Sequence, residues 1–85
     1  MSELTVELGR VIRKKRLGLG LSQEGFAARI GVHRTYVGGV ERGERNVTLL
    51  TLQAFAEGLN ASVAALIAEA EGQRPIAASN SDVDV

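Results

Sequence analysis

Apolar residues recur at three- and four-residue steps along most of this 85-residue chain, and this periodicity constrains the fold more than any other feature. Such spacing places side chains on one face of an α-helix, whereas a half-buried β-strand would alternate with period two. No segment alternates convincingly. Cysteine is absent, so disulfides and thiolate metal sites cannot stabilise the fold, and a core must come from the 45% of residues that are hydrophobic. We therefore predict an all-α fold.

Capping residues and glycines divide the apolar pattern into five short helices. Ser22, Thr48 and Ser62 are good N-cap residues, since their hydroxyls can accept a hydrogen bond from a free backbone N–H. Gly31 supplies the left-handed residue that a sharp turn between two helices requires. The expected helices cover about residues 5–17, 23–30, 33 or 34 to 42, 49–59 and 63–70.

The chain is expected to form one domain over residues 1–71, followed by a flexible acidic tail over residues 72–85. Small, polar and acidic residues dominate the tail, and such a composition does not support a packed core. The sequence has neither a transmembrane span nor an apolar signal core after a basic N-terminus, so we expect a cytoplasmic protein.

The net charge of zero conceals a strong segregation of charge. Between Leu8 and Asn46, nine basic residues stand against three acids, which gives this stretch a charge of +6. The remaining residues together carry a charge of −6. A basic half beside an acidic half favours a polyanion-binding face, although an ordinary solvated surface explains the charges about equally well.

The second and third predicted helices form the sharpest local motif. Relative to Ala27, the turn residue Gly31 lies four positions on, and the inward-facing Val37 and Val40 lie ten and thirteen positions on. A small residue at Ala27 allows the two helices to cross steeply, because their backbones approach closely there. This spacing is typical of a helix-turn-helix unit.

The segment LSQEGFAARIGVHRTYVGGVERGERN, residues 21–46, resembles the DNA-binding domain of the XRE/lambdoid-repressor family, and the resemblance covers about residues 4–70. Within that family the run HRTYVGGVERGERN is most similar to the controller proteins of restriction–modification systems. The resemblance implies a homodimeric transcription factor that binds double-stranded operator DNA and that would contact RNA polymerase if it activates. An antitoxin-type or phage-type repressor with a protein partner is the alternative, because related strings occur there too.

The third helix would present its N-terminal residues to DNA. With Val37 and Val40 facing inward, we expect Arg34, Thr35 and Tyr36 to read bases in the major groove. An arginine can grip guanine O6 and N7 bidentately. Half-buried packing against the second helix is the alternative role of the tyrosine. Two adjacent glycines, at positions 38 and 39, are expected to point outward and to permit close approach to DNA or to a partner subunit; the alternative is a weak stretch of helix that is simply tolerated.

Further residues are expected to position the DNA backbone. The amide of Gln23 lies at a helix N-terminus, where free N–H groups also favour phosphate. The predicted phosphate or minor-groove contacts are Gln23, His33, Arg42, Arg45 and Asn46. His33 has a second expected role as the cap of the third helix. The family resemblance implies a partly buried salt bridge between Arg16 and Glu41.

A dimer is expected because one small domain reads too few base pairs to specify a genomic site. Leu49 is assigned to the monomer core, and Leu50 lies about 100° round the same helix, so it should be exposed. The predicted dimer interface consists of Val47, Leu50, Ala54 and Ile67; the alternative is that Leu50 is a lone surface leucine, which is common. With a single histidine and no nucleophile placed beside it, we expect neither an enzyme nor a cofactor, metal or small-molecule site.

Overall fold

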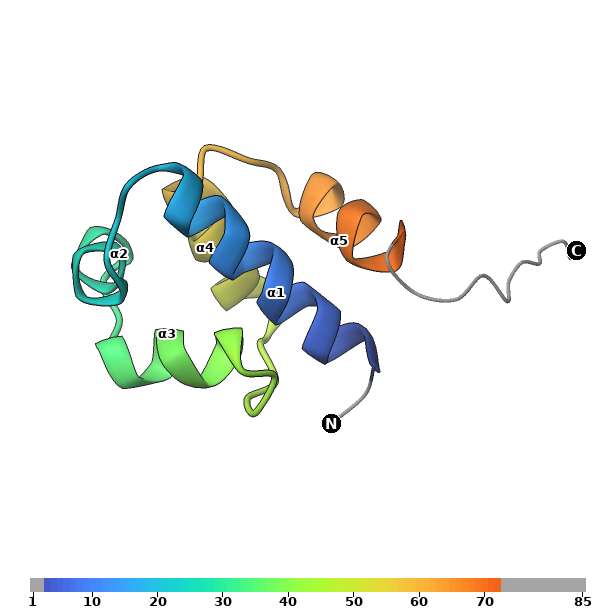
Figure 1. The fold of residues 1–85 in the computed structure, drawn as a ribbon, viewed down its shortest axis with the longest axis horizontal. Helices are drawn as coiled ribbons and strands as arrows, with labels where there is room; N and C mark the ends of the chain where they lie inside the picture. Colours follow the sequence, from blue (N-terminus) through green and yellow to red (C-terminus); the bar gives the residue numbers. More distant parts are fainter. Residues whose placement is uncertain (1–2, 73–85) are drawn as a thin grey trace, which may run out of the picture.

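The computed structural model describes residues 3–72, and the predicted acidic tail lies outside the described residues, apart from Gly72. The described residues form five helices and no strand, as the sequence predicts. They are α1 (Glu3–Gly18), α2 (Gln23–Ile30), α3 (Arg34–Glu41), α4 (Leu49–Gly58) and α5 (Val63–Gly72). Figure 1 shows α1 crossing between α3 on one side and α5 on the other, with α4 behind it.

The predicted caps begin the helices at the expected residues. Ser22, Thr48 and Ser62 each accept a hydrogen bond from the backbone N–H three residues on, at 2.9–3.1 Å. His33 caps α3, since its Nδ1 accepts from Thr35 N at 3.2 Å. Gly31 ends α2 in the left-handed conformation, with φ of 77°.

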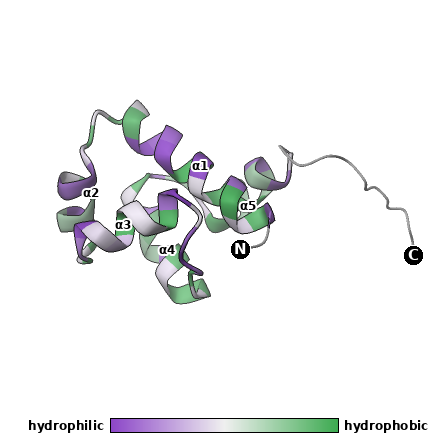
Figure 2. Cartoon of the chain, turned by 60° about the horizontal axis from the view of Figure 1, so that its bottom comes forward, coloured by the Kyte–Doolittle hydropathy of each residue, from purple (hydrophilic) through white to green (hydrophobic). Residues whose placement is uncertain are grey.

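The core lies where all five helices meet. Phe26 of α2 and Phe55 of α4 are fully buried, and their rings pack edge to face with centroids 5.6 Å apart. Val37 and Val40 of α3 are also buried, as predicted. Because both inward residues of α3 are held in this core, the opposite face of the helix has a fixed orientation. In Figure 2 the hydrophilic colour follows the outer turns of α1 and the loop after α3.

Two expectations about packing are wrong. Leu49 is 71% exposed rather than buried, because it starts α4 beside an open groove instead of under another helix. Gly38 and Gly39 are buried rather than open to close approach by DNA or a partner, since the side chains of Arg42 and Gln23 cover Gly38 and that of Arg45 covers Gly39. The helix ends otherwise agree with the approximate predicted bounds to within two residues; α5, for example, extends to Gly72 rather than to about residue 70.

No single helix within residues 3–72 is long and apolar enough to span a membrane. Taken together, α4 and α5 reach the required length and composition, but they are bent by 95° relative to one another.

Candidate nucleic-acid interface

The N-terminal end of α3 presents two of the three predicted base-reading residues. Arg34 and Thr35 are both exposed. The Thr35 hydroxyl lies 2.8 Å from Nδ1 of His33, the same nitrogen that accepts the backbone N–H of Thr35. Because Nδ1 acts as an acceptor in the cap, the neutral ring carries its hydrogen on Nε2. The exposed imidazole therefore offers an N–H donor next to the exposed guanidinium.

Tyr36, the third predicted base-reading residue, is half-buried. Its ring packs edge to face against Phe55, with centroids 6.1 Å apart, so the ring contact is with α4, whereas the packing alternative places it against the second helix. The guanidinium of Arg45 lies over the ring, 5.7 Å from its centroid. Tyr36 thus joins the core to the exposed arginine of the loop after α3.

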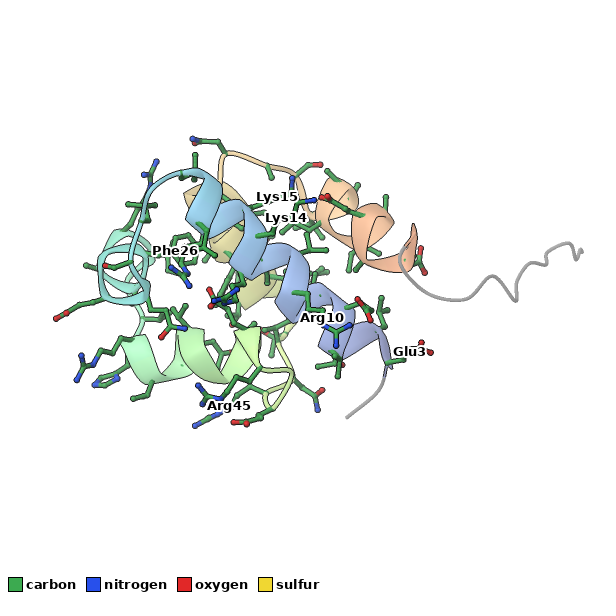
Figure 3. The ribbon with its side chains drawn as sticks, in the orientation of Figure 1. Glu3, Arg10, Lys14, Lys15, Phe26 and Arg45 are labelled. Atoms are coloured by element: carbon green, nitrogen blue, oxygen red, sulfur yellow. The ribbon has the colours of Figure 1, made fainter. Side chains whose placement is uncertain are left out.

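The two arginines that follow α3 lie back against that helix. A Cβ built on Gly38 would lie 3.0 Å from Nη1 of Arg42, and one built on Gly39 would lie 2.8 Å from Cγ of Arg45. The paired glycines therefore accommodate side chains of this chain. Figure 3 shows Arg45 beside the end of α3, and Asn46, the next residue, is exposed.

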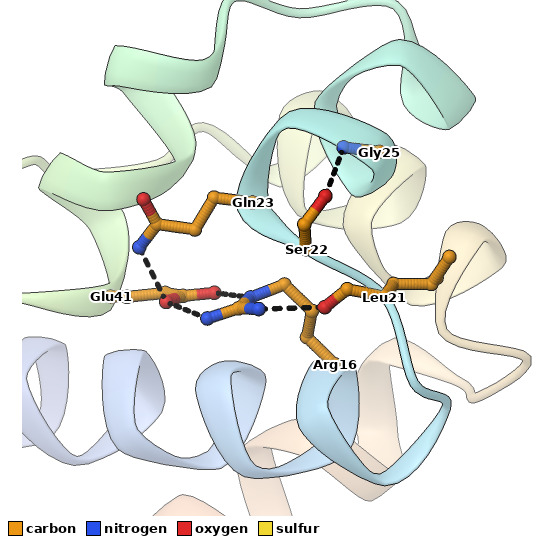
Figure 4. A network of polar contacts seen from close by, with 6 residues as sticks. All are labelled: Arg16, Leu21, Ser22, Gln23, Gly25 and Glu41. Carbon is orange, nitrogen blue, oxygen red and sulfur yellow. Dashed lines mark hydrogen bonds and ion pairs between the residues drawn. The ribbon is translucent and has the colours of Figure 1, made fainter.

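A buried polar network holds the end of α3 against α1 and α2 (Figure 4). Arg16 donates from Nε to Glu41 Oε2 at 2.6 Å, and from Nη2 to Oε1 at 3.0 Å. Its Nη1 donates to the carbonyl of Leu21 at 2.7 Å. The hydrogen bond to Glu41 raises the pKa of Arg16 above its ordinary value, although burial alone would lower it. The salt bridge implied by the resemblance is therefore present, and it is buried rather than partly buried.

Gln23 extends this network towards the surface. Its Nε2 donates to Glu41 Oε1 at 3.0 Å, a contact that the sequence pattern did not indicate. The amide carries two N–H groups, so a phosphate contact remains compatible with this bond. Gln23 is thereby oriented by the same carboxylate that anchors α3.

Two exposed acids lie beside the predicted DNA-contacting arginines. Arg34 Nη1 is 4.0 Å from Glu24 Oε1, and Arg42 Nε is 3.2 Å from Glu44 Oε2. All four side chains are at least 60% exposed. Exposed pairs of this kind contribute about 0–1 kcal/mol, so breaking them to free the arginines costs little.

The basic residues of α1 serve different purposes. Lys15 Nζ lies 3.1 Å from Glu69 Oε1 of α5, and Arg10 Nη1 lies 2.7 Å from Glu7 Oε2. In Figure 3 Lys14 and Lys15 lie on the side of α1 towards α5, away from α3. The Lys15–Glu69 pair therefore joins α1 to α5, whereas the Arg10–Glu7 pair lies within α1.

Comparisons with known proteins identify the fold and its relatives. Residues 12–66 match the helix-turn-helix family model. Control protein C.SmaI of Serratia marcescens is 52% identical over 60 residues, which cover 71% of each chain. The chain belongs to the helix-turn-helix family of controller proteins. The structure of controller protein C.AhdI from Aeromonas hydrophila is 44% identical with a TM-score of 0.71, covering 73% of this chain and 94% of that one.

A second solved controller contains DNA. The controller protein C.Esp1396I, a tetramer in complex with its natural 35 base-pair operator, has a TM-score of 0.73 and is 36% identical. The match covers 84% of this chain and 99% of that one. Both comparisons span all or nearly all of the solved chain, so the likeness extends beyond the helix-turn-helix unit.

The structure divides the predicted dimer residues of this controller-family chain into two groups. Val47 and Ile67 line a groove of about 240 Å³ that is bounded by α1, α4, α5 and the end of α3 with its following loop, and the exposed Leu49 lines it as well. Ala54 instead lines a separate hollow beside α2, and Leu50 is 77% exposed outside both. The sequence pattern missed Leu49 because periodicity alone cannot show where a helix end projects beyond its neighbours. Among the described residues, no three His, Cys, Asp or Glu residues are grouped as a metal site would require.

Proposed function

We propose that this chain is a sequence-specific transcriptional regulator that binds operator DNA as a homodimer and controls a restriction–modification system. The exposed N-terminal end of α3, held rigidly by the core and the Arg16–Glu41 bridge, carries this proposal. The chain is similar to two control proteins, and the matches cover 71% and 97% of the length of those proteins, which supports the proposal. The relatives are regulators rather than enzymes, which favours a binding function without catalysis.

The proposed mechanism divides the contacts by role. Arg34 and Thr35 read base edges in the major groove, and Tyr36 adds its phenol at the edge of the same surface. Gln23 and the N-terminus of α2 hold a phosphate, with His33 and Arg42 nearby. Arg45 and Asn46 reach the backbone or the minor groove. Activation would further require a contact with RNA polymerase.

Binding of selected DNA at increasing salt tests this proposal. Duplexes would be selected from a random pool with the full chain, and the affinity measured from about 50 to 200 mM salt. A dimer that neutralises about six to ten phosphates should lose roughly three to five decades of affinity over this range. A flat salt response, or equal affinity for scrambled duplexes and RNA, would contradict it.

Two variants separate base reading from phosphate positioning. Arg34→Ala should relax sequence choice, since a bidentate guanine contact contributes about 1–3 kcal/mol of discrimination. Gln23→Ala should weaken binding to all duplexes about equally. If both variants lost the same factor on selected and scrambled DNA, the assignment of roles would be wrong.

A further inference from the structure

Gly39 faces the side chain of Arg45 along its length. A Cβ at this position would lie 2.8 Å from Cγ, 3.4 Å from Nε and 3.6 Å from Cδ of Arg45. Cγ lies in the middle of the side chain, so the clash could not be relieved by moving only the guanidinium. The arginine occupies this path because residue 39 has no side chain.

The backbone of the loop brings Arg45 to this place. Gly43 has φ of 76°, and its N–H donates to the carbonyl of Val40 at 3.0 Å. The next N–H, of Glu44, donates to the carbonyl of Gly39 at 2.9 Å. This pair of bonds is the Schellman arrangement at a helix C-terminus, and it fixes the chain direction immediately before Arg45. The loop is therefore anchored on the residue that its arginine crosses.

The far end of the arginine has its own support. The guanidinium lies over the ring of Tyr36, which is three residues before Gly39 and thus on the same side of α3. The Tyr36 ring is itself fixed against the buried Phe55. Three features of α3 therefore determine the position of Arg45. The hydrogen bonds at the helix C-terminus fix the backbone before it, Gly39 leaves room for the middle of its side chain, and Tyr36 contacts its guanidinium.

We propose that Gly39 is a positioning residue for Arg45: its missing side chain lets the arginine lie across α3 onto Tyr36, ordered before it meets DNA. This inference rests on the proposed function, in which Arg45 contacts the DNA backbone or minor groove. Ordering an arginine in advance removes part of the entropy lost when it is immobilised on binding. Gly39 acts only through Arg45 and makes no DNA contact itself.

The first experiment uses no DNA. Side-chain protons of Arg45 over an aromatic ring carry an upfield ring-current shift in the NMR spectrum. Gly39→Ala should abolish this shift, whereas Gly18→Ala, whose Cβ would meet nothing within 4 Å, should leave it unchanged. An unchanged Arg45 spectrum in folded Gly39→Ala overturns the proposal. If Gly39→Ala alone unfolds, the Gly39→Ala/Arg45→Ala double variant should regain a helical fold, because the clashing side chain is gone, and failure to do so also overturns it.

The second experiment measures affinity for the selected duplex in a double-mutant cycle. Gly39→Ala should weaken binding about three- to tenfold per site, the cost of ordering one long side chain. In an Arg45→Ala background the same substitution should change affinity by less than about twofold. An equal loss in both backgrounds contradicts the inference. Failure of wild-type protein to bind any selected duplex would instead contradict the proposed function, and leave the NMR result to decide the placement of Arg45.

Discussion

Glu41 carries more of the architecture than any other single charged residue. Its side chain is 1% exposed, and it accepts hydrogen bonds from Arg16 of α1 and Gln23 of α2. A buried carboxylate is tolerated only when its charge is matched and its lone pairs are satisfied. Both conditions are met here, so the orientation of the last turn of α3 depends on this residue.

Removing one partner of the bridge should therefore be costly. Glu41→Ala leaves the Arg16 charge buried and should lower the free energy of unfolding by about 3–5 kcal/mol. Because the pKa of Arg16 is raised, the arginine stays charged and its contribution is lost only at strongly alkaline pH. Urea denaturation followed by circular dichroism measures the change. The exposed Glu57→Ala is the control and should stay within about 0.5 kcal/mol of wild type; equal effects would contradict the assignment.

At the scale of the helices, two glycines set the distances between them. A Cβ on Gly9 of α1 would clash with the carbonyl of Val40 and lie 2.7 Å from that of Glu41. A Cβ on Gly58 of α4 would clash with Ile30 and lie 2.9 Å from Cε1 of Phe26. Close approach of α1 to α3, and of α4 to α2, requires residues without side chains. A glycine within a helix ordinarily only lowers the stability of that helix, but Gly58 is required for packing.

Gly9→Ala should destabilise the domain although alanine is the better helix former. Overpacking against backbone carbonyls costs about 1–3 kcal/mol, more than the roughly 1 kcal/mol gained in helix propensity. Gly18→Ala in the same helix has open space around it and should be neutral or stabilising. Thermal unfolding of both variants provides the comparison. A rise in melting temperature for Gly9→Ala would contradict the close approach of α1 to α3.

At the scale of the whole molecule, an unfilled groove lies beside α4. Leu49 and Leu50 are adjacent and 71% and 77% exposed, and Leu49 lines the groove together with Leu4, Val47 and Ile67. The groove is lined by α1, α4 and Ile67 of α5, and also by Val40 of α3 and the loop that carries Arg45 and Asn46. Arg34 and Thr35 do not line it, so a second copy in the groove would leave the N-terminal end of α3 uncovered. The predicted dimer is compatible with base reading by Arg34 and Thr35 for this reason.

The interface is tested by charge insertion. Leu50→Glu and Ile67→Glu should each give a folded, helical monomer that binds operator poorly, because a carboxylate would be desolvated in the dimer. Leu17→Glu, at an exposed leucine near the end of α1, is the matched control and should stay dimeric. Sedimentation measures the mass of each. Intact dimers for Leu50→Glu and Ile67→Glu would place the interface elsewhere.

Local signals in the sequence were enough to determine the helices, their caps and the helix-turn-helix unit. Ser22, Gly31 and Thr48 act within a few residues of themselves, so their structural roles follow from side-chain chemistry and backbone freedom. The exposure of Arg34 and Thr35 follows in the same way, because Val37 and Val40 orient the helix. Their part in reading DNA remains a prediction.

Tertiary structure alone decided which distant residues meet. Three features depend on how helices and loops cross: the contact of Gln23 with Glu41, the position of Arg45 over Gly39, and the exposure of Leu49. Periodicity describes one helix at a time and carries no distance between elements. For that reason the glycines of α3 were predicted to face DNA, whereas the fold covers them with the chain's own arginines.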